Sequence, residues 1–363
     1  MPNAPVLSLI RIFGGRGRSV TKKGYLLVQP TLTGEQPRRY WIWQKPWFHT
    51  FWRRAALIAA PIVTNGLYAS VAVSQESLHH IDPLIFVACQ MVLLLPVALG
   101  LLWSTRGAFS SWFFQQGAVG GLLLGVGFVC VALSLRTIGV VPTASLTALD
   151  GVLMSGFSWL VLRRKHSSFT CLAAICALGG ALLLWWIAPG ALQTDVLALG
   201  CGLLFTAYSF HVERSAVMQA QPGSLVAFFG GLFISMAAVT TILALCFGSW
   251  PSARSFTATD LELLLYTSLA TVLIPVVLST LLLRRLSAVT LAFCAILEPT
   301  ISLGLASLLG TLSMSWTGWL GIGLILLSVL VQAISAAAAR VPEAHQINTV
   351  DSIPSNPGGG CVS

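Results

Sequence analysis

Long runs of apolar residues constrain this chain more than any other feature of its sequence. A helix needs about 20 apolar residues to cross the hydrocarbon core of a bilayer, and ten runs of that length follow one another along the chain. They lie at approximately residues 55–75, 83–103, 112–134, 141–162, 168–188, 194–213, 224–247, 261–283, 288–310 and 316–339. Because the runs are apolar on every side, without the alternation of barrel strands, the sequence predicts an all-α membrane protein with ten transmembrane helices.

The composition leaves little room for a soluble domain. Hydrophobic residues make up 56% and charged residues 9% of the 363 positions, whereas an ordinary globular domain is about 25% charged. The connections between the apolar runs are short. We therefore expect the chain from residue 55 to residue 339 to consist of membrane spans and their loops.

The net charge of +9 is concentrated before the first run. Residues 1–54 hold ten of the 20 Lys and Arg residues and one acidic residue, Glu35. This segment ends in the stretch "YWIWQKPWFHTFWRR", whose aromatic and basic residues are typical of an interfacial anchor. We expect a basic cytoplasmic tail that attracts anionic lipid headgroups. Since the segment contains no nucleic-acid-binding motif, we expect no nucleic acid partner.

The remaining basic residues predict the orientation. With ten spans and a cytoplasmic amino terminus, every Lys and Arg except Arg136 and Arg254 falls on the inner side. The positive-inside rule therefore places both termini in the cytoplasm. We expect a multi-pass protein of the plasma membrane, the inner membrane of a bacterial cell. The Pro, Gly and Ser content of residues 340–363 is typical of a disordered cytoplasmic tail.

The chain resembles itself when it is shifted by 148 residues. The shift aligns Asp150 with Glu298 and Arg136 with Arg284, within the stretches 133–162 and 281–310. A repeat of five spans is odd-numbered, so the second copy enters the membrane from the opposite side. The sequence thus predicts a 5+5 inverted repeat, an architecture in which secondary transporters bind substrate near the midplane.

Three stretches resemble a known family. "AILEPTISLGLASLLG" and "WTGWLGIGLILLSVLV" resemble the last two helices of an EamA-type domain of the drug/metabolite transporter superfamily, and "ALSLRTIGVVPTASLTALDGVLMSGFSWLVL" is similar to the same region of the first EamA repeat. The resemblance implies a first repeat at residues 55–188 and a second at 194–339. It also implies a central cavity and the export or exchange of small metabolites such as amino acids.

The chain departs from the family pattern at specific positions. Leu162-Arg163 and Gly310-Thr311 stand where the family often has Gly-Glu, and Cys89-Gln90 occupies the region of a mid-span Arg. Without that Arg, no basic residue lies deep in a span to pair with either carboxylate. Recognition of an anionic substrate by a buried cation is therefore not expected.

Asp150 and Glu298 are the strongest candidates for a functional role. A charged side chain at the bilayer centre costs about 3 kcal/mol or more, so it normally faces the bundle interior or a cavity. Each carboxyl could hold a proton, a coupling cation or a substrate amino group. Alternatively, each could be a neutral hydrogen-bonding group between helices.

Further polar residues within the runs could line a pathway or bond one helix to another. The candidates for substrate or proton binding besides the two carboxylates are Asn65, Tyr68, Gln90, Tyr208 and Ser302. A ladder of small residues on the third run, Gly117, Gly121 and Gly125, instead favours close helix packing.

The sequence therefore predicts a secondary transporter, an exporter or exchanger of a small polar metabolite such as an amino acid, working by alternating access. Proton coupling stays open at this point, as does a homodimer. The alternative is a non-transporting membrane scaffold or receptor. An enzyme is not expected, because the runs lack clustered nucleophiles, bases and metal ligands; no cofactor and no metal are expected either.

Overall fold

A computed structural model describes residues 59–70, 80–104, 110–138, 140–147, 149–187, 192–215, 222–250, 256–308 and 314–338. The chain divides into two units, residues 1–60 and 61–363, and the helices from Pro61 onward belong to the second. The expected basic tail at 1–54 and the expected disordered tail at 340–363 lie outside the described residues.

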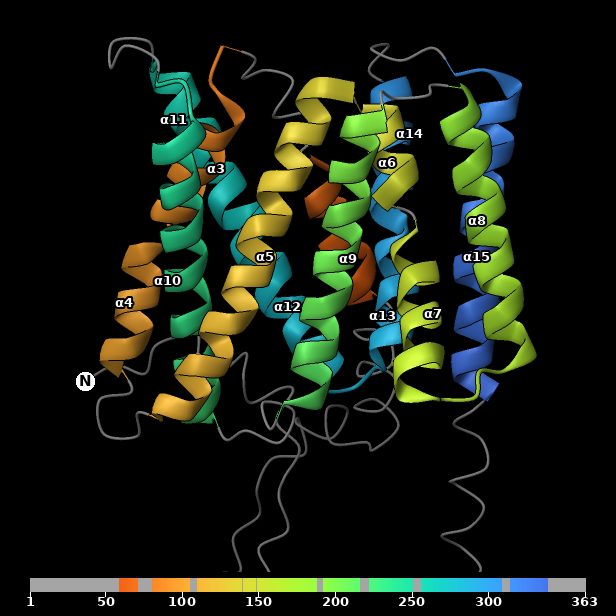
Figure 1. Cartoon of the computed structure of the whole chain (residues 1–363), viewed down its shortest axis with the longest axis horizontal. Helices are drawn as coiled ribbons and strands as arrows, with labels where there is room; N and C mark the ends of the chain where they lie inside the picture. Colours follow the sequence, from red (N-terminus) through yellow and green to blue (C-terminus); the bar gives the residue numbers. More distant parts are fainter. Residues whose placement is uncertain are drawn as a thin grey trace, which may run out of the picture. The chain divides into compact units, whose positions relative to one another are not determined.

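The described part of the chain is all helical, as predicted, and contains no strand. Residues 59–70 form the first described helix. The helices that follow are α3 (Pro83–Val92), α4 (Leu95–Ser104), α5 (Ser111–Ile138), α6 (Val140–Thr147), α7 (Asp150–Leu162), α8 (Ser168–Ile187), α9 (Leu192–Arg214), α10 (Pro222–Phe247), α11 (Ala258–Tyr266), the π-helix η2 (Thr267–Leu273), α12 (Ile274–Leu283), α13 (Ala288–Ala295), α14 (Leu297–Leu308) and α15 (Trp316–Ala338). Figure 1 shows them running side by side along one common direction.

Eight helices in the described residues are long and apolar enough to cross a membrane. They correspond to eight of the ten predicted spans, and they make the chain a multi-pass integral membrane protein. The remaining two predicted spans are described only in part or as a shorter apolar segment. Of 55–75, only residues 59–70 are described, and 141–162 corresponds to a shorter apolar segment, Ser145–Val161, that includes the junction of α6 and α7.

Several spans are interrupted instead of continuous, which the run lengths did not predict. Proline accounts for three of the interruptions, because it cannot donate the backbone hydrogen bond to the residue four positions earlier. Pro96 follows the gap between α3 and α4, Pro299 follows the gap between α13 and α14, and Pro275 follows η2. No proline lies at the junction of α6 and α7, where Leu149 N–H instead bonds Leu146 O across a tighter turn.

Glycines allow α5 and α10 to pack closely, as the glycine ladder predicted. A Cβ atom on Gly117 would overlap the carbonyl oxygen of Phe228, and one on Gly121 would overlap that of Leu232. At Gly125 the added atom would lie 2.5 Å from Val239 Cγ1. The ladder therefore serves helix packing, and it holds α5 against α10 beside α9.

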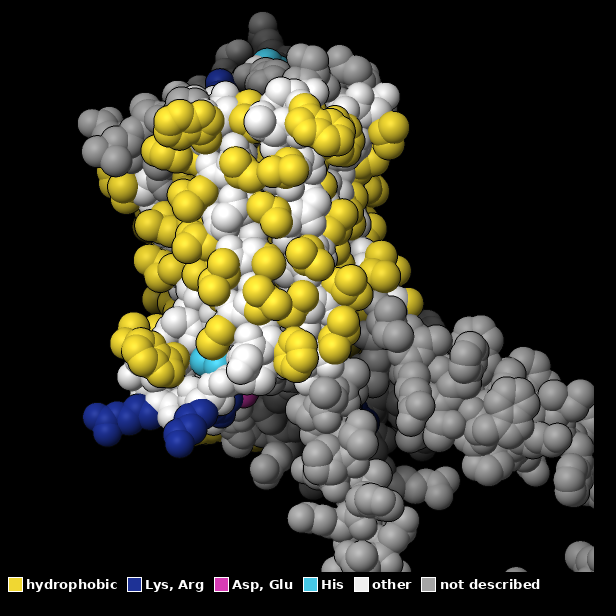
Figure 2. Space-filling model, turned by 90° about the vertical axis from the view of Figure 1, so that its right-hand side faces the viewer, with side chains coloured by type: hydrophobic (Ala, Val, Ile, Leu, Met, Phe, Trp, Pro, Cys, Tyr) yellow, Lys and Arg dark blue, Asp and Glu magenta, His cyan; other side chains and the backbone are white. Residues whose placement is uncertain are grey.

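The face formed by α8 and α15 shows how the bundle meets lipid. Figure 2 shows hydrophobic side chains over this face and Lys and Arg side chains at its lower edge. Ile175 is 66% exposed on α8 and Leu330 is 57% exposed on α15. The described basic connections, residues 163–165 and 284–285, lie at the same lower end of the bundle in Figure 1. Basic residues therefore gather at one end of an apolar surface.

Candidate substrate cavity

Asp150 and Glu298 both stand at the start of the second half of an interrupted helix. Asp150 is the first residue of α7, which follows α6, and Glu298 is the second residue of α14, which follows α13. Helix amino termini favour negatively charged groups, and transporters often place substrate at such interrupted helices. The two junctions come from segments that the sequence aligned, and α7 packs against α13.

Asp150 is buried and hydrogen-bonded. Its side chain is 9% exposed, and Thr206 on α9 donates its hydroxyl to Asp150 Oδ1 at 2.6 Å. Asp150 is not one of the residues that line the cavity beside Glu298. It nevertheless acts electrostatically on the Glu298 carboxyl.

Glu298 lines a cavity between helices from both ends of the chain. Helix 59–70 and α5 contribute one wall, and α9, α12, α13 and α14 contribute the rest. The cavity has a volume of about 90 Å³. Its lining residues are Pro61, Thr64, Asn65, Tyr68, Leu124, Phe205, Tyr208, Ser209, Val276, Ser279, Leu283, Leu291, Ala292, Ala295 and Glu298. No hydrogen bond joins the Glu298 carboxyl to another described residue.

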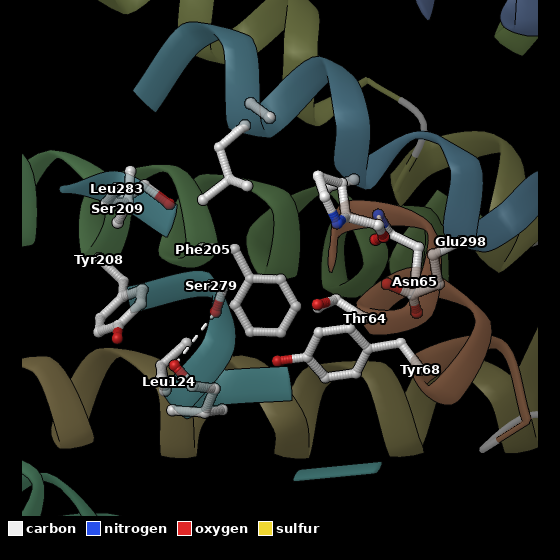
Figure 3. Close-up of a pocket in the computed structure, with 15 residues that line it drawn as sticks. Thr64, Asn65, Tyr68, Leu124, Phe205, Tyr208, Ser209, Ser279, Leu283 and Glu298 are labelled. Atoms are coloured by element: carbon white, nitrogen blue, oxygen red, sulfur yellow. Dashed lines mark hydrogen bonds between the residues drawn. The ribbon is translucent and has the colours of Figure 1, made fainter. Parts of the chain in front are cut away.

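Asn65 fastens the junction of α13 and α14 to helix 59–70. Its side-chain nitrogen donates to Pro61 O at 2.6 Å and to Cys294 O at 2.9 Å. Because both neighbours are carbonyl oxygens, the amide must turn its nitrogen toward them. Both amide protons are then used, and the amide oxygen remains as an acceptor. Figure 3 shows Asn65, Tyr68 and Glu298 on the same side of the Phe205 ring.

Tyr208 lies on the other side of that ring in Figure 3. Its hydroxyl is 2.6 Å from Thr280 Oγ1, and the Thr280 hydroxyl itself donates to Val276 O at 2.7 Å. Since Thr280 has only one hydroxyl proton, Tyr208 must be the donor of their bond. The Tyr208 oxygen can therefore only accept a further hydrogen bond.

Aromatic rings form much of the cavity wall. Phe205, Tyr68 and Tyr208 line it. Phe128 on α5 packs behind them, with its ring centroid 6.3 Å from that of Tyr68 and 5.6 Å from that of Phe205. The cluster fixes the Tyr68 and Phe205 rings beside the carboxyl group.

The predicted site residues thus separate into two groups. Asn65, Tyr68, Tyr208 and Glu298 line one cavity, although they come from segments more than 200 residues apart in the chain. The other three lie outside the lining: Asp150 is bonded to Thr206, Gln90 is buried in α3, and Ser302 donates to Ala69 O at 3.3 Å. Ser302 therefore joins α14 to helix 59–70.

Several cavity residues were not predicted from the sequence. Phe205, Ser209 and Ser279 line the cavity, and Thr206 bonds Asp150. Phe205 carried no signal, because one aromatic residue in an apolar run is indistinguishable from a lipid-facing one. Thr206 was a polar residue in a span and could have been included with Tyr208.

Polar contacts join the helices at the end of the bundle opposite the basic connections. His80 Nε2 lies 3.1 Å from Asp260 Oδ2, and Ser70 Oγ lies 2.9 Å from the Tyr266 hydroxyl. Asp82 caps α3 and accepts the Ser249 hydroxyl at 2.6 Å. Burial acts to raise the pKa of the Asp82 carboxyl, but hydrogen bonds from the Ser249 side chain and from backbone N–H groups outweigh it and lower the pKa below its ordinary value.

The fold and the cavity define the class: a multi-pass integral membrane protein, helical throughout its described transmembrane part, with a cavity lined by apolar and polar side chains. Residues 55–186 match the model described as the EamA-like transporter family, which confirms the expected resemblance for that part of the chain. Members of this family are transporters and not enzymes. Residues 55–186 of this chain are therefore similar to a family of membrane transporters.

Solved structures share the fold. One, titled "Crystal structure of protein", is 17% identical in sequence, with a TM-score of 0.61 over 79% of this chain and 99% of that chain. Comparison with curated protein sequences gives no match.

Proposed function

We propose that this protein is a secondary transporter that moves a small polar metabolite carrying an amino group through the cavity beside Glu298. The observation that carries the proposal is the Glu298 carboxyl, which lines a cavity between helices of both halves and has no hydrogen bond to a described residue. A carboxyl group in that position needs a proton, a cation or a donor from a substrate.

We further propose alternating access between the two halves of a 5+5 inverted repeat. The crossed contacts of α7 with α13 and of α6 with α14, between the two interrupted helices that the sequence aligned, support this arrangement, as does the contact of α8 with its counterpart α15. The cavity extends to Leu283 and Leu291, which flank the basic α12–α13 connection. Beyond its other end, the Ser302–Ala69 and Ser70–Tyr266 contacts join the helices. This conformation then represents one of two access states.

Counterflow in proteoliposomes tests the proposal. Vesicles preloaded with one unlabelled amino acid or amine at a time receive the same compound in labelled form, and a transporter accumulates the label transiently. Empty vesicles are the control. Accumulation that depends on the protein supports transport. Binding of a compound without counterflow for any member of the panel would favour the alternative function, a scaffold or receptor.

Proton coupling of Glu298 is the second part of the proposal. Glu298→Gln keeps the size of the side chain but cannot release a proton. Uphill uptake driven by a pH gradient should therefore fail in this variant, while counterflow without a gradient continues at a reduced but measurable rate. Unchanged gradient-driven uptake would exclude Glu298 as the coupling group.

A further inference from the structure

The hydrogen-bonding groups of the cavity are unequally divided between donors and acceptors. The two amide protons of Asn65 are bound to backbone carbonyls, and the Tyr208 proton is bound to Thr280. Ser279 donates its proton to Val276 O at 3.2 Å. Each of these side chains keeps an oxygen with accepting capacity.

The donors that remain are few and uncharged. The hydroxyls of Tyr68 and Ser209 have no hydrogen bond to a described residue, and Figure 3 draws them apart from each other. Thr64 already has a partner within the protein. Among the described residues that line the cavity, none is Lys, Arg or His.

The acidic groups at the cavity have no basic counterpart among the described residues that line it. Glu298 lines it, and Asp150 acts on Glu298 electrostatically from α7. The rings of Tyr68, Phe205 and Tyr208 add negative π-faces, which attract a cation. A ligand carboxylate would meet these groups without a cation to pair with and would lose its hydration.

From these hydrogen-bonding and charged groups we infer that the cavity selects organic amines over zwitterionic amino acids. Such amines have an ammonium group on a small apolar body and no carboxylate. The ammonium group donates to Glu298 and to the acceptor oxygen of Asn65, while the apolar body contacts the aromatic wall. This inference rests on the proposed function, whose substrate class it narrows.

Two matched series of ligands test the inference on the full-length protein in nanodiscs by calorimetric titration. The first is 3-methylbutylamine, leucine and 4-methylpentanoate; the second is 2-phenylethylamine, phenylalanine and 3-phenylpropanoate. Within each series the body is the same, and the compounds differ in the ammonium and carboxylate groups. We expect at least one amine to bind about tenfold or more tightly than its amino acid, a difference of about 1.4 kcal/mol, with no detectable binding of the acids.

Variants identify the site. Glu298→Gln should weaken amine binding about tenfold or more, whereas Glu262→Gln, the same change at an exposed position of α11, should leave it unchanged. Phe205→Leu should weaken it about threefold to tenfold through loss of the ring face. The ligand series needs no variant, so a misfolded variant does not remove the test.

The outcomes separate this inference from the proposed function. Equal or tighter binding of the amino acid in both series, or the absence of binding for both amines, overturns the inference, and so does unchanged amine binding by Glu298→Gln. Amine binding in the expected order without any counterflow refutes the transport function alone. Counterflow of amino acids but not of amines refutes the inference and leaves transport standing.

Discussion

Asp150 and Glu298 occupy matching places in two interrupted helices, but their surroundings differ. Asp150 is 9% exposed and accepts a 2.6 Å hydrogen bond from Thr206. Glu298 borders a cavity and has no hydrogen bond to a described residue. A satisfied buried carboxyl contributes to structure, whereas an unsatisfied one beside open space is available to a ligand. Two residues that the sequence aligns can therefore differ in the hydrogen bonds that their surroundings supply.

The neighbours of the two residues produce this difference. Thr206 on α9 supplies the hydroxyl at the α6–α7 junction. At the α13–α14 junction, Asn65 instead donates to the backbone, at Cys294 O. The α13–α14 junction is thus held through its backbone, and the Glu298 carboxyl is left without a hydrogen-bond donor among the described residues.

The largest effect should come from comparing the two amide variants in counterflow. Glu298→Gln should reduce the rate about tenfold or more, because loss of one charged hydrogen-bonding group costs about 1.5–3 kcal/mol. Asp150→Asn should reduce it less than about threefold, since the Asn oxygen can still accept the Thr206 hydroxyl. The measurement is the initial rate at matched reconstitution. Equal losses would mean that the two carboxyls act as one unit.

The stability of the folded protein tests the hydrogen bond between Thr206 and Asp150. Thr206→Val removes the donor and leaves the buried carboxyl unsatisfied, which should lower the free energy of unfolding by about 1–3 kcal/mol. Thr206→Ser keeps the hydroxyl and serves as the control. Thermal unfolding in detergent reports the difference. A Val variant as stable as the Ser variant would show that the bond to Asp150 contributes nothing.

The stability of the α13–α14 junction, beside Glu298, should depend on the Asn65 side chain. Asn65→Ala removes two hydrogen bonds to backbone carbonyls, at about 1 kcal/mol for one typical bond. Asn65→Asp should be more damaging than Asn65→Ala, because it turns a carboxylate toward Pro61 O and Cys294 O. Thermal unfolding of the two variants ranks them. The reverse order would contradict the donor role assigned to the amide nitrogen.

The smallest effect concerns Asp82, a carboxyl outside the spans that is fully supplied with donors. Its pKa is lowered in the folded protein, so its stabilising effect is present at neutral pH and is lost as the pH falls through that lowered value. Asp82→Asn should cost about 0.5 kcal/mol or less at pH 7, since Asn caps helices nearly as well as Asp.

Thermal unfolding of wild-type protein and Asp82→Asn across acid pH provides the check. The two melting temperatures should converge as Asp82 becomes protonated. If the two melting temperatures still differ at acid pH, the effect comes from the shape of the side chain at position 82 and not from its charge. Glu262→Gln, at an exposed position in α11, provides the baseline for removing a surface charge.

The sequence by itself determined that this chain is a helical membrane protein and identified the pair of carboxyl groups. Runs of about 20 apolar residues have few alternatives to spanning helices, because every backbone polar group must be satisfied within the segment. An acidic residue inside such a run is costly enough to be conspicuous, and this made Asp150 and Glu298 visible without coordinates. The glycine ladder of α5 was readable for a similar reason, since small residues at a helical spacing favour close packing.

The tertiary structure alone decided which of these groups borders the cavity. A span that is apolar all round does not reveal which face meets lipid and which meets another helix, so Phe205 on the cavity wall resembled any lipid-facing aromatic residue. Thr206 and Asn65 acquire their roles from Asp150 and Cys294, partners that lie 56 and 229 residues away along the chain. Whether a buried carboxyl is satisfied depends on such partners, and only the packing of distant helices brings them within hydrogen-bonding distance.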